Sequence, residues 1–147
     1  MTIVEQLNEV YWKEEWWQPH NETPAGITNY HQWMLDRGNI ICYVEDGKLL
    51  GYCEFWRINF TQFGRLVCHT HFSAPFEDTL NGNICYVANA WIDKKYRMGK
   101  VYKDLRDRFF KLNCHCDFFV GEALRKKTQP IKVFTRKDFY DKYTKEK

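Results

Sequence analysis

The stretch Asn83-Ile-Cys-Tyr-Val-Ala-Asn-Ala-Trp-Ile92, followed by Asp93-Lys-Lys-Tyr-Arg-Met-Gly99, decides how this chain is expected to fold. The first ten residues are rich in β-branched and aromatic side chains, which is typical of a strand. Neither alternating face of this strand is strongly polar. We therefore expect it to be central in a sheet and covered on both sides, and to end in a short basic turn.

An amphipathic helix is predicted directly after this turn. Val101, Leu105, Phe109 and Leu112 recur at helical spacing, and charged residues occupy the opposite side. The first N–H groups of a helix lack partners within the helix, and the helix dipole places partial positive charge there. A buried strand that leads through a basic turn into such a helix predicts an anion-binding site.

The remaining periodic segments give an α+β order of elements. They are helices at 2–18, 27–37, 121–127 and 139–147, and strands at 39–44, 49–60, 64–72, 117–120 and 131–134. Together with the central strand they predict a mixed, mostly antiparallel sheet of about six strands with helices on both faces. The whole chain, 1–147, is expected to form a single domain.

Two local signals support the first half of this order. Glu45-Asp-Gly-Lys48 is a strong hairpin turn between the first two strands. Gly38 is expected to end the second helix in a left-handed conformation, since glycine adopts it without strain. His31 lies on that helix and is expected to be exposed.

Composition predicts an ordered protein of the cytoplasm. Aromatic residues make up 18% of the chain, which argues against disorder. No apolar run is long enough to span a membrane, and acidic residues throughout the first 19 positions exclude a signal peptide. Most of the six cysteines lie in apolar segments, where reduced cysteine behaves as a small hydrophobic residue.

Two clusters, Cys68-His-Thr-His71 and Cys114-His-Cys116, contain residue types that bind metals. Structural zinc sites use pairs of ligands two to four residues apart, with a second pair later in the chain. The spacing here instead places alternate residues on one strand face. We therefore expect no metal site.

The last 25 residues are basic, with nine Lys or Arg against three Asp or Glu. Such a segment suits an acidic partner, although a solvated tail is the default interpretation. Phe134, Phe139, Tyr140 and Tyr143 alternate there with Lys and Arg, as the stacking platforms of single-strand-binding proteins do. Nucleic acid therefore stays open as an alternative partner.

The hairpin Glu45-Asp-Gly-Lys-Leu-Leu-Gly-Tyr52, and the strand that enters a basic turn and a helix, resemble the Gcn5-related N-acetyltransferase (GNAT) fold. In that superfamily the turn reads Arg-x-x-Gly-x-Gly/Ala, and its backbone amides hold the pyrophosphate or pantetheine of an acyl carrier. Here Arg97-Met-Gly-Lys-Val-Tyr102 places Lys100 and Tyr102 at the two small positions. The resemblance implies that the carrier contacts Trp91, Ile92, Arg97, Gly99, Lys100 and Val101.

The RTX-toxin-activating lysine acyltransferases (the hemolysin-activating type) depart from this motif in a similar way. The chain resembles them at Trp91-Ile92, at Gly99-x-Val-Tyr-Lys-x-Leu-Arg-x-Arg-Phe109 and at Tyr52-Cys53. These enzymes move a fatty acyl group from acyl carrier protein to internal lysines of a toxin. The resemblance implies acyl carrier protein or acyl-CoA as co-substrate, no permanently bound cofactor and a lysine or small-amine acceptor. It leaves a homodimer open.

The catalytic pair of that family is a His after the first helix and an Asp before the Trp-Ile pair. His20 matches the His and is the expected base, since imidazole titrates near neutral pH. The Asp position falls on Ala90. Asn89 is a candidate to orient the imidazole if a bulge rotates it, because a regular strand places it on the face opposite Ala90. The missing Asp leaves open a non-catalytic binding protein on a degenerate GNAT-like scaffold.

Overall fold

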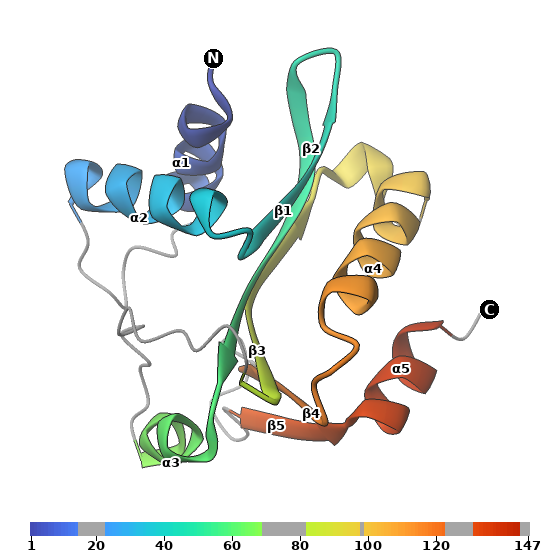
Figure 1. Cartoon of the computed structure of the whole chain (residues 1–147). Coiled ribbons are helices and arrows are strands. Elements are labelled where there is room, and N and C mark those ends of the chain that lie inside the picture. Colours follow the sequence, from blue (N-terminus) through green and yellow to red (C-terminus); the bar gives the residue numbers. More distant parts are fainter. Residues whose placement is uncertain (15–22, 69–81, 98, 123–130, 145–147) are drawn as a thin grey trace.

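The computed structural model describes residues 1–14, 23–68, 82–97, 99–122 and 131–144 (Figure 1). In chain order the elements are α1 (Ile3–Lys13), α2 (Pro24–Asp36), β1 (Ile40–Glu45), β2 (Lys48–Ile58), α3 (Phe60–Cys68), β3 (Ile84–Ile92), the 3-10 helix η1 (Lys94–Tyr96), α4 (Lys100–Leu112), β4 (Phe118–Glu122), β5 (Ile131–Thr135) and α5 (Arg136–Thr144).

The five described strands form one sheet in the order β1-β2-β3-β4-β5, so β3 is its central strand, as predicted. All neighbouring strands are antiparallel except β3 and β4, which are parallel. Helices α1 and α2 cover one face of the sheet, and α4 and α5 cover the other (Figure 1). The expected α+β fold with a mixed sheet is therefore confirmed, with five strands among the described residues rather than about six.

The segment predicted as a strand over 64–72 is helical as far as Cys68, so that prediction was wrong there. The cause is a reciprocal cap at Asn59. Its side-chain oxygen accepts the Gln62 N–H at 2.9 Å, and the Gln62 side-chain oxygen accepts the Asn59 N–H at 2.9 Å. This capping box satisfies helix donors before α3 begins and starts a helix where the apolar residues alone suggested a strand. The helical turn expected from Gly121 is also wrong for its first two residues, which continue β4.

The predicted turn signals are confirmed. Asp46 and Gly47 both have positive φ, 52° and 76°, which a two-residue hairpin turn requires at its central positions. Gly38 follows α2 with φ 75°, the left-handed conformation that ends many helices. None of the helices within the described ranges is both long and apolar enough to cross a membrane.

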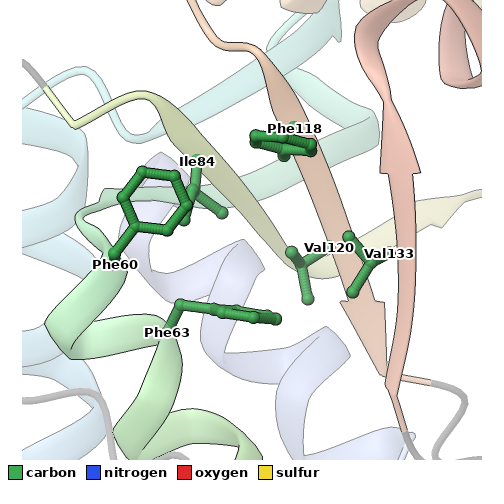
Figure 2. A pocket seen from close by; sticks show the side chains of 6 residues that line it. All are labelled: Phe60, Phe63, Ile84, Phe118, Val120 and Val133. Carbon is green, nitrogen blue, oxygen red and sulfur yellow. The ribbon is translucent and has the colours of Figure 1, made fainter.

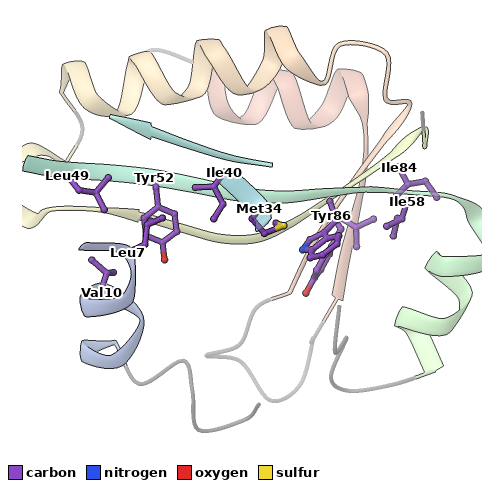
Figure 3. Close-up of a cluster of buried hydrophobic side chains, with 11 residues drawn as sticks. Leu7, Val10, Met34, Ile40, Leu49, Tyr52, Ile58, Ile84 and Tyr86 are labelled. Atoms are coloured by element: carbon purple, nitrogen blue, oxygen red, sulfur yellow. The ribbon is translucent and has the colours of Figure 1, made fainter. Parts of the chain in front are cut away.

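Two apolar cores lie on opposite faces of the sheet. The core under α1 and α2 contains Leu7, Met34, Tyr52, Trp56 and Ile84, all 0–2% exposed (Figure 3). Complete burial of such side chains stabilises a fold by roughly 1.5–3 kcal/mol each.

The second core lies under α4 and α5. Its centre is Phe109 of α4, whose ring lies 5.4 Å from Phe55 and 5.9 Å from Phe119. Gly51 of β2 lets α4 approach the sheet, because a Cβ there would lie 2.9 Å from Val101 Cγ1. The first turn of α4 is therefore held tightly against the β1–β2 hairpin.

Helix α5 packs its aromatic residues inward. The Phe139 ring stacks on Phe119 with 4.6 Å between centroids, and the Tyr143 ring lies 4.6 Å from Phe139. Phe134 packs against the same core, while Tyr140 is 51% exposed. Three of the four rings considered as stacking platforms for nucleic acid are thus used in packing, and this argument for a nucleic-acid surface fails for them.

Candidate functional site

A β-bulge in the middle of β3 determines which side chains face α1 and α2. Glu54 of β2 pairs with Asn89, whereas the next residue, Phe55, pairs with Val87, so Ala88 is an extra residue in β3. Tyr86 before the bulge and Trp91 after it pack in the same core, although a regular strand would place them on opposite faces. The alternation predicted for β3 is therefore wrong beyond Ala88. The bulge required for Asn89 to point inward is present.

Among the described residues, the second half of β3 has an open edge on the side of β4. Strand β4 pairs with β3 only over Ile84–Val87, while β2 pairs with β3 as far as Ile92. Within the described residues, 88–92 therefore have a strand neighbour on one side only. An open strand edge presents backbone N–H and C=O groups that an extended ligand can pair with. This edge leads directly to η1 and the N-terminus of α4 (Figure 1).

The basic turn at the end of this edge is shaped by its own side chains. Asp93 caps η1 by accepting the Lys95 N–H at 3.0 Å, which fits its expected place in the turn. Arg97 Nε donates to the Ile92 carbonyl at 3.1 Å, and its side chain otherwise remains exposed. Gly99 has no side chain to cap α4, so the first N–H groups of the helix lack a side-chain partner there.

Lys100 and Val101 contribute differently to this turn. Lys100 Nζ forms an exposed ion pair with Glu45 Oε1 at 2.8 Å, and this hydrogen bond raises the pKa of Lys100. Glu45 therefore offsets part of the positive charge that the sequence indicated. The Val101 side chain is fully buried beneath Gly51, so only its backbone is available to a ligand.

The most unusual polar group in the described residues is Glu54, which the sequence analysis did not single out. Its side chain lies on the α1–α2 face of β2 and is 3% exposed. Oε2 accepts a hydrogen bond from Asn89 Nδ2 at 2.8 Å, and Oε1 has no hydrogen-bond partner in the described part of the chain. Burial raises the pKa of Glu54, whereas its hydrogen bonds with Tyr30 and Asn89 lower it by a smaller amount.

Aromatic side chains surround this carboxylate. Tyr52 and Trp56 flank Glu54 on the same face of β2, and the Trp91 ring lies 6.2 Å from Tyr52. Tyr30 of α2 stacks on Trp56 at 6.2 Å, and both burial and the charge of Glu54 raise the pKa of its hydroxyl. A signal for this site exists in the sequence, since Glu54 is the single acidic residue in the otherwise apolar run 49–56.

His31 was expected at the surface, and that expectation is wrong. It is 3% exposed because α1 packs over α2 at this point. Asn8 Nδ2 donates to Thr28 Oγ1, which leaves Asn8 Oδ1 to accept from His31 Nδ1 at 2.7 Å. Burial lowers the pKa of His31 to about 4, so its imidazole is neutral at physiological pH.

The other candidates from the sequence fall in different places. His20 lies outside the described residues, so its relation to Asn89 stays a prediction. His69 and His71 of the first Cys/His cluster also lie outside them. Ala90 is exposed and pairs with Cys53 across the sheet. No group of three or more His, Cys, Asp or Glu side chains within the described ranges is arranged to hold a metal ion.

An apolar pocket of about 100 Å³, drawn in Figure 2, is lined by Ile84 at the start of β3 and therefore lies at the opposite end of this strand from Asn89. It is lined by Phe60, Phe63, Ile84, Phe118, Val120 and Val133. Phe60 and Val133 at its rim are 62% and 52% exposed. The pocket is on the same sheet face as Glu54, because Ile84 and Val120 belong to the core under α1 and α2.

Comparison with known proteins identifies the fold of this chain but does not assign it to a family. No known family model and no curated protein matches the sequence. A crystal structure of a putative acetyltransferase from Staphylococcus aureus Mu50 matches 100% of this chain and 89% of that one, with a TM-score of 0.52 and 8% identity. The GNAT-like decarboxylase GphF, in complex with isobutyryl-CoA, matches 68% of this chain with a TM-score of 0.51 and 13% identity. This chain spans only about half, 51%, of the GphF chain.

At such low identity these likenesses define the fold alone. The chain has a GNAT-like fold, as the order of its elements predicted. Activity has to be argued from the site.

Proposed function

We propose that this protein is an acyltransferase that moves an acyl group from acyl-CoA or acyl carrier protein to a lysine or other amine. The observation that carries the proposal is the edge of β3 over 88–92, which no described strand covers and which lies beside the N-terminus of α4. The pantetheine arm shared by both carriers contains amide groups, which can pair with an open strand edge as an added strand does. The binding of isobutyryl-CoA by a protein of the same fold supports this assignment.

The carrier's phosphate groups would then meet the turn between β3 and α4. Arg97 and Lys100 are exposed there, and the free N–H groups of the helix favour an anion. The backbone N–H groups of 90–92 are candidates to stabilise the thioester oxyanion. The resemblance to lysine acyltransferases suggests His20 as the base. The hydrogen bond from Asn89 to Glu54 on the inner face of the sheet supports a role for Asn89 in the site.

The binding step is tested by titrating the protein with CoA and acetyl-CoA in a calorimeter. Reversing two exposed charges with Arg97→Glu and Lys100→Glu is expected to weaken binding by about three- to tenfold at low salt, since each exposed ion pair contributes roughly 0.2–1 kcal/mol. Lys111→Glu makes the same change of charge at the exposed far end of α4 and serves as the control. Equal binding by all variants would refute the phosphate assignment.

A non-catalytic binding protein on the same scaffold is the second candidate, and the alanine at the family's Asp position favours it. The two candidates differ in one result. The acyltransferase gives an acylated amine detectable by mass spectrometry, whereas the binding protein binds the acyl carrier and returns the thioester unchanged.

We also propose a cytoplasmic location. Cys42, Cys53, Cys85, Cys114 and Cys116 are all unpaired. Free thiols of this kind fit a reducing compartment.

A further inference from the structure

We propose that Glu54, oriented by Asn89, is the carboxylate that binds the ammonium group of the acceptor and takes up its proton, in place of the His20 that the resemblance suggests as the base. The inference rests on the proposed acyl transfer, and it names both the class of acceptor, a cationic primary amine, and the residue that recognises it.

The first argument is the burial of a carboxylate without a cation. Glu54 is 3% exposed, and within the described residues it has no ion-pair partner. Acidic side chains are almost never fully buried unless they are paired, because removing a charge from water is costly. Asn89 donates to Oε2 and Tyr30 also hydrogen-bonds this side chain, whereas Oε1 has no hydrogen-bond partner among the described residues and can accept from a ligand.

The second argument is the way in which the fold orients this carboxylate. The extra residue Ala88 turns Asn89 to the α1–α2 face, and the Asn89 amide then holds Glu54 Oε2 at 2.8 Å. Bulges of this kind often redirect a side chain beside an active site. Asn89 also belongs to the half of β3 that has an open edge, so the carboxylate lies next to the segment proposed to bind the thioester.

The third argument concerns the surroundings of Glu54. Tyr52, Trp56 and Tyr30 lie around it, and aromatic faces attract cations and repel anions. The combination of one carboxylate with several aromatic rings suits an ammonium group on an apolar stem, such as the side chain of lysine. An acidic acceptor would be excluded by the charge of Glu54.

The proposed step balances in protons and bonds. Glu54 takes one proton from the ammonium, and the free amine attacks the thioester carbonyl carbon, so that a C–N bond forms. Collapse of the tetrahedral intermediate breaks the C–S bond, and the departing thiolate takes the second proton of the nitrogen. The products are an amide and a thiol, and Glu54 returns its proton to water. Burial raises the pKa of Glu54, which favours proton uptake, while its hydrogen bonds with Tyr30 and Asn89 act in the opposite direction. Tyr30, Tyr52 and Cys53 are the titratable groups that interact electrostatically with it.

The inference is tested by titrating n-butylammonium chloride into the protein and following the side-chain amide resonances of asparagine by NMR. The parent protein is expected to bind the cation and to shift the Asn89 side-chain signals. Binding should strengthen as the pH rises through the pKa of Glu54, because only the carboxylate attracts the cation. In Glu54→Gln, which keeps an oxygen to accept from Asn89, binding should weaken at least tenfold and lose its pH dependence.

Glu9→Gln removes an exposed carboxylate from α1 and is the matched control. Equal binding by the parent and Glu54→Gln, or no binding by the parent, would overturn the inference. Acetyl-CoA titrations of the same samples report separately on the proposed function. If no sample binds acetyl-CoA while the parent and Glu9→Gln still bind the ammonium ion, acyl transfer is refuted but the ammonium site at Glu54 is not.

Discussion

Acidification should destabilise this protein through His31, and the size of the effect follows from its burial. The pKa of His31 is lowered from 6.5 to about 4, a difference of about 2.5 pH units. Each unit corresponds to about 1.4 kcal/mol. His31 is 3% exposed, so solvent screens little of the effect, and about 3 kcal/mol of stability is expected to depend on its neutral form.

The direction follows from where protons bind. Below pH 6.5 the unfolded chain protonates this imidazole, whereas the folded protein does not until about pH 4, so the unfolded state binds more protons. This contribution is therefore complete above pH 6.5 and is lost progressively as the pH falls toward 4.

Urea unfolding followed by tryptophan fluorescence at pH 7.5, 6.0 and 4.5 measures this loss. Carboxylates also titrate in this range, so the useful quantity is the difference between the parent and His31→Gln, whose amide can still donate to Asn8. The variant should lose about 2–3 kcal/mol less than the parent between pH 7.5 and 4.5. His115→Gln, at an exposed position, is the control. The same loss in the parent and in His31→Gln would refute the reasoning.

Three further outcomes are expected. Gly51→Val should lower the free energy of unfolding, measured in urea, by about 1–3 kcal/mol. The valine side chain would overlap α4, because even a Cβ at position 51 would lie 2.9 Å from Val101 Cγ1. Unchanged stability would contradict this packing. Glu54→Gln should melt at a higher temperature than the parent at pH 8 but not at pH 4. Because burial raises the pKa of Glu54, the parent is stabilised at low pH, where this carboxyl is protonated, and loses that stability as the pH rises through the pKa. Equal melting temperatures of the two proteins at both pH values would disprove the burial effect. With a thiol reagent, exposed Cys114 should react first and buried Cys85, whose pKa is raised by burial, only on unfolding; the reverse order would be inconsistent with the fold.

The elements that the sequence predicted well are those with strong local signals. The strand 84–92 is apolar on both alternating faces, which is typical of a central strand, and it is central. The Asp46-Gly47 turn needs two residues with positive φ, and these residue types adopt it readily. Helix α4 followed from its apolar spacing alone.

The features that the sequence did not predict depend on contacts between distant segments. The position of the bulge at Ala88 depends on how β2 pairs with β3, and alternation within β3 cannot locate it. The burial of Glu54 depends on α2, which places Tyr30 near it, and the burial of His31 depends on α1. In α3 a reciprocal cap formed by Asn59 and Gln62 prevailed over an apolar pattern that had been interpreted as a strand.

The central claim is that an acyl thioester pairs with the open edge of β3. The most direct measurement is an NMR titration of isotope-labelled protein with acetyl-CoA, followed through the backbone amide signals. The largest shifts are expected over 88–92 and at the turn 97–101, with small shifts on the paired half, Ile84–Val87. Shifts confined to other elements, or none at all with acetyl-CoA in large excess, would contradict the claim.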